Sequence, residues 1–239
     1  MKRVFRPLFL TALLSLLFPP HSRAQATPVA DPRVSAVQDA LQPQFIPPPP
    51  GTYTLPTIDT VTDHLFLDTA GKPVSLFSLT KQKAALISFM YTSCADVGGC
   101  PLAAAVLQQI DRLLSARPEL AKQAVLLSVS FDPERDTPLR LAEVQETLQP
   151  RSDWRFLTTA TSADMQPVLA DFHQPAVKLW KEDGNWSGLF RHVLKVYLLD
   201  ANHNVRNIYS AGLLNAQLVL NDIETVLQKP NDHSAHNSP

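Results

Sequence analysis

Hydrophobic runs alternate with amphipathic segments along residues 51–228 of the chain. Residues 84–91 are mostly apolar and have the length of a strand, which is typical of a strand buried at the centre of a sheet. A second apolar run, 125–131, is closed by Asp132 and Pro133. The remaining strand patterns are shorter: a hairpin over 64–76 that turns near Gly71, a strand at 154–157, and a hairpin formed by 193–199 and 205–209.

Four segments repeat their apolar residues at helical spacing and are predicted to be helices. The first begins at Pro101, which suits the first position of a helix, and must stop before Pro118. The others are 138–148, with Thr137 or Asp136 as the N-cap, 162–172, and 215–227. The order of elements predicts an α/β fold with a central mixed sheet and helices on both faces. Its parallel strands are joined by right-handed crossovers, and an antiparallel pair is added at the end.

The two ends of the chain have different patterns. Three basic residues precede an apolar run at 8–18, and small residues follow, so residues 1–24 are predicted to be a signal peptide cleaved near Gln25. The run of eleven residues is too short to span a bilayer comfortably, and an uncleaved membrane anchor is the alternative. Residues 25–50 are predicted to be a proline-rich linker, and 229–239 a flexible tail. The folded domain is therefore expected at 51–228.

Composition narrows the class of protein. The chain has 239 residues, 45% of them hydrophobic, and a net charge of −1, which describes a globular protein with one good-sized core. Basic residues form no long run outside the N-terminus, so neither nucleic acid nor a polybasic membrane contact is expected. Export would place the protein in the periplasm or outside the cell, where cysteines pair as a disulfide unless a reductant or a metal prevents it.

The only two cysteines, Cys94 and Cys100, lie between a predicted buried strand and a predicted helix. Ligands and reactive groups gather at this edge of an α/β sheet, and a helix N-terminus stabilises a thiolate. A disulfide here would close a short loop and reduce the conformational entropy of the unfolded chain by only about 2.4 kcal/mol, so it would stabilise the fold weakly. The pattern favours redox or metal chemistry over a structural bridge, which remains an alternative.

Three motifs together resemble the Sco/SenC family. They are residues 87–94 with Cys100 and Pro101, residues 128–138, and His192 followed by 196–200. The resemblance implies a thioredoxin-like fold in an exported or membrane-tethered protein. It also implies copper as the bound metal, with Cys94 and Cys100 as thiol ligands and His192 as the imidazole ligand.

The resemblance implies a function in delivering copper to, or preparing the thiols of, the dinuclear copper centre of cytochrome c oxidase. The partners would be a copper-accepting oxidase subunit or an upstream copper donor, with the membrane close by if the N-terminus stays uncleaved. Two soft thiolates do select Cu(I) on chemical grounds, and one imidazole completes a three-coordinate site. The alternative is a periplasmic thiol–disulfide oxidoreductase with Cys94 and Cys100 as its catalytic pair, in which Cys94 attacks by analogy with other thioredoxin-like proteins.

Two features depart from the family pattern. Five residues separate the cysteines instead of three, and Arg191 stands where the family has an aspartate before the histidine. Glycines at 98 and 99 are expected to let the longer loop fold back and bring the sulfurs together. Arg191 is expected to lower the thiol pKa values if its guanidinium comes close. Both departures favour a redox role.

Other residues receive simpler interpretations. Residues 132–137 are interpreted as a turn and a helix cap in preference to a docking site. Three histidines are expected to be solvated: His64, His173 and His203. Five apolar residues are expected in the core, with an exposed docking surface as the alternative for the last two: Phe89, Met90, Trp154, Trp180 and Trp186.

Overall fold

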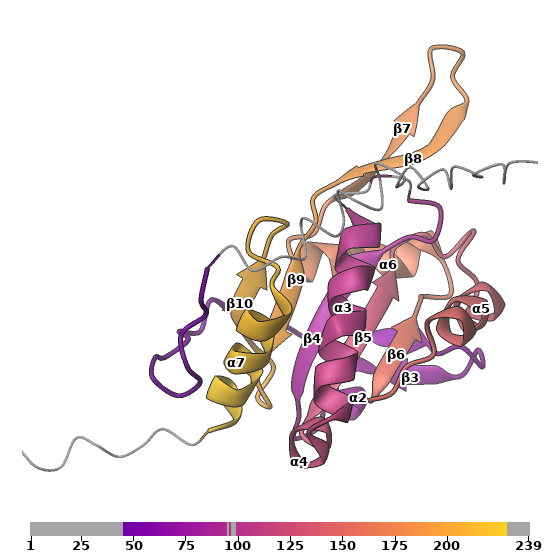
Figure 1. The fold of residues 1–239 in the computed structure, drawn as a ribbon. Coiled ribbons are helices and arrows are strands. Elements are labelled where there is room, and N and C mark those ends of the chain that lie inside the picture. Colours follow the sequence, from indigo (N-terminus) through magenta and orange to yellow (C-terminus); the bar gives the residue numbers. More distant parts are fainter. Residues whose placement is uncertain (1–44, 95, 97–98, 229–239) are drawn as a thin grey trace, which may run out of the picture. The chain divides into compact units, whose positions relative to one another are not determined.

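The computed structural model describes residues 45–94, 96 and 99–228 (Figure 1). All of them belong to the compact unit Asp31–Pro239. The predicted signal peptide, residues 25–44 of the predicted linker and the predicted tail lie outside the described residues. The last residues of the linker are described and are bound to the domain, because the Pro48 carbonyl accepts a hydrogen bond from Asn221. Gly51, the first residue of the predicted domain, donates its N–H to the Thr225 hydroxyl.

A six-stranded mixed sheet forms the centre of the domain, in the order β1-β10-β9-β4-β5-β6. Its strands are β1 (Asp59–Thr60), β4 (Ala84–Met90), β5 (Ala124–Ser130), β6 (Trp154–Leu157), β9 (Val196–Leu199) and β10 (Asn204–Tyr209). Strands β4, β5 and β6 are parallel, and β9 and β10 continue the sheet in antiparallel pairing. The predicted α/β class, the parallel centre and the antiparallel pair at the end are confirmed.

Two hairpins form separate two-stranded sheets. The first, β2 (Leu65–Leu67) with β3 (Pro73–Ser75), was predicted. The second, β7 (Ala176–Trp180) with β8 (Trp186–His192), was not predicted. Its strands are only half buried, and a register shift between Lys178 and Trp180 interrupts their alternation. His192 therefore ends a strand and does not simply precede one.

The helices are α2 (Leu76–Leu79), α3 (Cys100–Ser115), α4 (Pro118–Ala121), α5 (Pro138–Leu148), α6 (Ser162–Asp171) and α7 (Ala216–Leu227). Side-chain caps fix where the last three begin. Thr137, Thr161 and Asn215 each accept a hydrogen bond from a backbone N–H in the first turn of α5, α6 and α7, respectively. Helix α3 ends before Pro118, as predicted.

The sheet has a hydrophobic core on each face. Alternate residues of β4 point to opposite sides, so Leu86 packs with α3 and α7 while Ile87 packs with α6. Both side chains are almost fully buried, and burial of each contributes about 1.5–3 kcal/mol. In Figure 1, α3 and α7 lie side by side on one face of the sheet. The prediction of helices on both faces is confirmed.

The ends of β4 and β5 are joined by a buried carboxylate. Asp136 is fully buried and accepts hydrogen bonds from the Thr92 N–H at 2.9 Å, the Thr92 hydroxyl and the Ser130 hydroxyl. Thr92 follows β4 and Ser130 ends β5, so Asp136 fixes the two strand ends relative to each other. The segment 132–137 is the turn and helix cap that the sequence predicts, and in addition it supports the residues that lead to Cys94.

In the part of the chain that the structure describes, no helix combines the length and apolar character needed to cross a membrane.

Candidate metal centre

The cysteine loop begins at the end of β4 and ends at the start of α3. The Cys94 N–H bonds to the Tyr91 carbonyl at 3.3 Å, which makes a turn directly after the strand. Cys100 is the first residue of α3, with Gly99 as its N-cap. Cys94 and Cys100 are not joined in a disulfide; Cys94 is half-buried and Cys100 is 9% exposed.

Of the two glycines that were expected to let the cysteine loop fold back, the structure describes Gly99. Gly99 has a φ of −104°, so it does not use the left-handed region that favours glycine. A side chain at this position would still meet the Asp96 carbonyl oxygen at 3.3 Å, so the close approach of the backbone favours glycine. Residues 95, 97 and 98 lie outside the described residues.

His192 is placed by aromatic packing at the end of β8. Its ring centroid lies 5.7 Å from that of Tyr91 and 5.1 Å from that of Phe131. Phe190, two residues earlier on the same face of β8, packs edge-on against both of these rings. Tyr91 and Phe131 follow β4 and β5, so the carboxyl ends of two central strands build the wall that holds the imidazole.

The three predicted site residues come together in the structure. The Sγ atoms of Cys94 and Cys100 and a ring nitrogen of His192 all lie within 4.8 Å of one another. The loop with five intervening residues therefore brings both sulfurs to one place, as expected. Two thiol sulfurs and one imidazole nitrogen form a donor set that suits a soft, low-coordinate metal ion.

The two thiols differ in their protonation. A hydrogen bond from Cys100 holds the pKa of Cys94 well below its ordinary value; burial opposes this, and the His192 ring and the backbone N–H groups of Cys100 and Asp96 add to it. The hydrogen bond to Cys94 and burial both raise the pKa of Cys100. Cys94 is thus the thiolate, and Cys100 is the thiol that donates to it.

Neighbouring groups respond to this charge. Burial, and then the negative charge on Cys94, raise the pKa of Tyr91 to about 12, so its hydroxyl stays protonated. Arg191 is exposed and is not among the main groups that shift the pKa of Cys94. Successive side chains of a strand point to opposite faces, and Arg191 precedes His192 on β8. The influence of Arg191 on the thiols that was expected from the sequence has no support here.

The expectation of solvated histidines is right for one residue and wrong for two. His173 has a side chain that is 77% exposed. His64 is largely buried, and its Nε2 atom forms a hydrogen bond with the carboxylate of Asp171 at 2.7 Å, a partner 107 residues away in the chain. His203 stacks on Phe77 with ring centroids 3.6 Å apart, and its Nε2 atom is buried. No local sequence pattern connects these pairs.

The tryptophans also divide. Trp154 is buried and donates a hydrogen bond to the Ser128 hydroxyl, as expected of a core residue. Phe89 is buried too, and Met90 is partly buried against both cores. Trp180 is 65% exposed on the hairpin, so the core prediction is wrong for it. Trp186 is half-buried and packs edge-on against the Phe190 ring.

Comparison with known proteins decides the family. The family model described as SCO1/SenC matches residues 53–228. This chain belongs to the SCO1/SenC family. The SCO1/SenC match covers all three motifs on which the resemblance was based. A search of the curated proteins finds no match.

Solved SCO1/SenC structures share the fold, which is thioredoxin-like as predicted. Copper-bound ScoI of Bradyrhizobium japonicum has 23% identity and a TM-score of 0.54, and the match covers 67% of this chain and 98% of that one. A SCO1/SenC family lipoprotein of Bacillus anthracis has 25% identity and a TM-score of 0.58 over 71% and 95% of the two chains. BsSco, in which a disulfide switch was identified, has 25% identity and a TM-score of 0.55 over 71% and 94%.

Proposed function

We propose that this SCO1/SenC protein binds Cu(I) through Cys94, Cys100 and His192 and delivers it to the dinuclear copper centre of cytochrome c oxidase. The observation that carries the proposal is the meeting of two sulfurs and one imidazole nitrogen within 4.8 Å in a member of this family. Thiolate ligands favour Cu(I) over harder ions, and an imidazole nitrogen suits copper as well.

Proton release accompanies metal binding at this site. Cys94 is already a thiolate, whereas Cys100 must give up the proton that it shares with Cys94. With both sulfurs ionised and a neutral imidazole, bound Cu(I) leaves one net negative charge. Three ligands leave a coordination position open, through which an acceptor thiolate can attack the ion and receive it by stepwise exchange.

The oxidase and the cell compartment are part of the same proposal. BsSco is described as a member of a family of cytochrome c oxidase assembly proteins, and ScoI of B. japonicum has been solved with copper bound. The charged and apolar N-terminal pattern supports export, and a relative from B. anthracis is a lipoprotein. The partners would be a copper-accepting oxidase subunit and an upstream copper donor.

A second candidate function rests on the asymmetry of the thiols. Cys94 is half-buried and ionised, whereas Cys100 is buried and protonated, which matches the attacking and resolving cysteines of a thiol–disulfide oxidoreductase. The Cys94 thiolate would break a partner disulfide and form a mixed disulfide, releasing one partner thiolate. Cys100 would then lose its proton and attack the Cys94 sulfur. This step forms the Cys94–Cys100 disulfide and leaves the partner reduced.

An anaerobic Cu(I) titration against a competing chelator separates the two functions. The parent should bind one Cu(I), Cys94→Ser/Cys100→Ser should lose binding, and His192→Ala should bind more weakly. His173→Ala is the matched control, because His173 is an exposed histidine that is not among the proposed copper ligands. If the parent binds weakly but reduces a protein disulfide rapidly, the oxidoreductase function replaces copper delivery. If His192→Ala binds as tightly as the parent, the imidazole is not a ligand.

A further inference from the structure

The β7–β8 hairpin, which carries His192, is not stabilised by pairing with the central sheet. Strands β7 and β8 pair only with each other among the described residues, outside the six-stranded sheet. In Figure 1 the hairpin extends away from that sheet. An isolated two-stranded ribbon is marginally stable in water. The position of His192 therefore depends on contacts between the hairpin and the rest of the domain.

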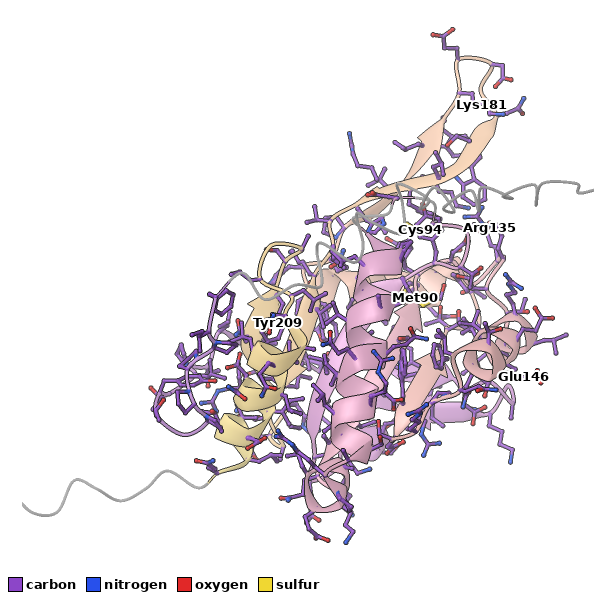
Figure 2. The ribbon with its side chains drawn as sticks, viewed as in Figure 1. Met90, Cys94, Arg135, Glu146, Lys181 and Tyr209 are labelled. Atoms are coloured by element: carbon purple, nitrogen blue, oxygen red, sulfur yellow. The ribbon has the colours of Figure 1, made fainter. Side chains whose placement is uncertain are left out.

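The packing of Phe190 and His192 on the Tyr91 and Phe131 rings is one of these contacts. A second is made by Arg135, in the turn after β5. Its Nη1 donates a hydrogen bond to the Gly188 carbonyl of β8 at 2.9 Å. Its guanidinium carbon lies 4.3 Å from the centre of the Trp186 ring and 5.9 Å from that of Phe190. Figure 2 labels Arg135 near the base of the hairpin and Lys181 toward its far end.

The guanidinium of Arg135 also contacts residues of the domain. Nε of Arg135 bonds to the carboxylate of Asp132, whose side chain is 1% exposed, and the guanidinium carbon lies 5.7 Å from the Tyr91 ring centre. Arg135 thus connects β8 to the strand ends that form the wall around His192. Gly188 fits this contact: its φ is +82°, and a Cβ there would lie 3.4 Å from Nη1.

An ion pair forms a third and weaker link between the hairpin and the domain. Lys178 of β7 pairs with Glu134 at 2.8 Å, with side chains that are 29% and 53% exposed. Exposed ion pairs of this kind contribute little because water screens them. The Arg135 side chain is also 29% exposed, but the carboxylate that it binds, that of Asp132, is only 1% exposed. Arg135 adds cation–π contacts with rings of both the domain and the hairpin to this charged hydrogen bond.

Phe190, which Arg135 contacts, shares one face of β8 with His192. The two residues lie two positions apart in the regularly paired part of β8, and both pack against Tyr91 and Phe131, so their side chains face the domain. We propose that Arg135 is a positioning residue that clasps the β7–β8 hairpin to the domain and so sets how often the His192 imidazole lies at the cysteine pair. This inference rests on the proposed function, since it makes Arg135 a determinant of copper affinity through His192.

Hydrogen–deuterium exchange of the metal-free full chain tests, without copper, whether Arg135 holds the β7–β8 hairpin to the domain. In Arg135→Gln, amides of 186–192 should exchange about tenfold faster, because a charged hydrogen bond and a stacked cation are lost, while β4 stays protected. Arg135→Lys should fall between the two, because it keeps the charge but not the planar fork. Arg191→Gln, which removes an exposed arginine beside His192, should match the parent. Unchanged exchange in 186–192, or an equal loss of protection in β4, would show that Arg135 does not hold the hairpin to the domain.

A double-mutant cycle tests whether Arg135 acts through His192. Arg135→Gln should lower Cu(I) affinity about tenfold in the parent, because affinity scales with the fraction of closed hairpin, and should have no further effect in His192→Ala. Equal losses in both backgrounds, or no loss in the parent, would refute the positioning role. If His192→Ala alone changes nothing, the proposed ligand set fails and Arg135 cannot control copper through it, while the exchange data still decide whether it holds the hairpin.

Discussion

At the scale of single residues, the site is determined by groups that do not belong to the donor set. Tyr91 and Phe131 hold the His192 ring, and Asp136 holds the segment that leads to Cys94. Each of these groups lies at or just after the end of β4 or β5. The geometry of the three donor atoms therefore depends on how the two central strands end.

Replacement of Asp136 should destabilise the domain. In Asp136→Ala, the Thr92 N–H and the Ser130 hydroxyl lose their buried acceptor, and the free energy of unfolding should fall by about 3 kcal/mol. Urea denaturation measures the change. Asp136→Asn keeps one acceptor oxygen and should lose less. An Ala variant as stable as the parent would show that these hydrogen bonds contribute nothing net.

The His64–Asp171 pair should make stability depend on pH. Burial acts to raise the pKa of Asp171, but hydrogen bonds from Thr62 and His64 outweigh it and hold the pKa below its ordinary value. The stabilisation is therefore complete above the unfolded pKa, about 3.9, and is lost as the pH falls through the lower folded value. The gap in unfolding free energy between the parent and Asp171→Asn should narrow from pH 6 to pH 3. A constant gap would contradict this.

At the scale of elements, the sequence predicts those parts whose pattern is local. Strands β4 and β5 are continuous apolar runs, and α3, α5 and α7 begin at recognisable caps or prolines. The β7–β8 hairpin escapes prediction because its strands are at most half buried and a register shift interrupts their alternation. Its contact with Arg135 joins residues 53 positions apart in the chain. The same reason explains the site. The resemblance assigns ligand roles to Cys94, Cys100 and His192, whereas Arg135 lies in the motif 128–138 but its contact with Gly188 has no local signal in the sequence.

The N-cap of α7 gives a test at this scale. The Asn215 side chain accepts hydrogen bonds at 3.0 Å from the N–H groups of Gln217 and Leu218, and the helix covers one face of the sheet. Asn215→Ala should lower the free energy of unfolding by about 1 kcal/mol. Asn215→Asp should lower it much less, because a carboxylate oxygen can accept the same hydrogen bonds. Chemical denaturation of both variants checks this, and equal losses would show that the side-chain oxygen is not the stabilising group.

At the scale of the whole molecule, the mixed sheet and the hairpin have separate tasks. The sheet with its two cores holds Cys100 at the N-terminus of α3. The hairpin, which is only half buried, brings the imidazole to the sulfurs from outside the sheet. Under the proposed function, copper has to be released as well as bound, and a third ligand carried on this half-buried hairpin suits that requirement.

X-ray absorption spectroscopy at the copper edge of the Cu(I)-loaded protein tests the central claim most directly. The parent should show two sulfur ligands and one nitrogen ligand, and His192→Ala should lose the nitrogen while keeping both sulfurs. A spectrum with sulfur ligands alone in the parent, unchanged in His192→Ala, would contradict a site built from both cysteines and the imidazole.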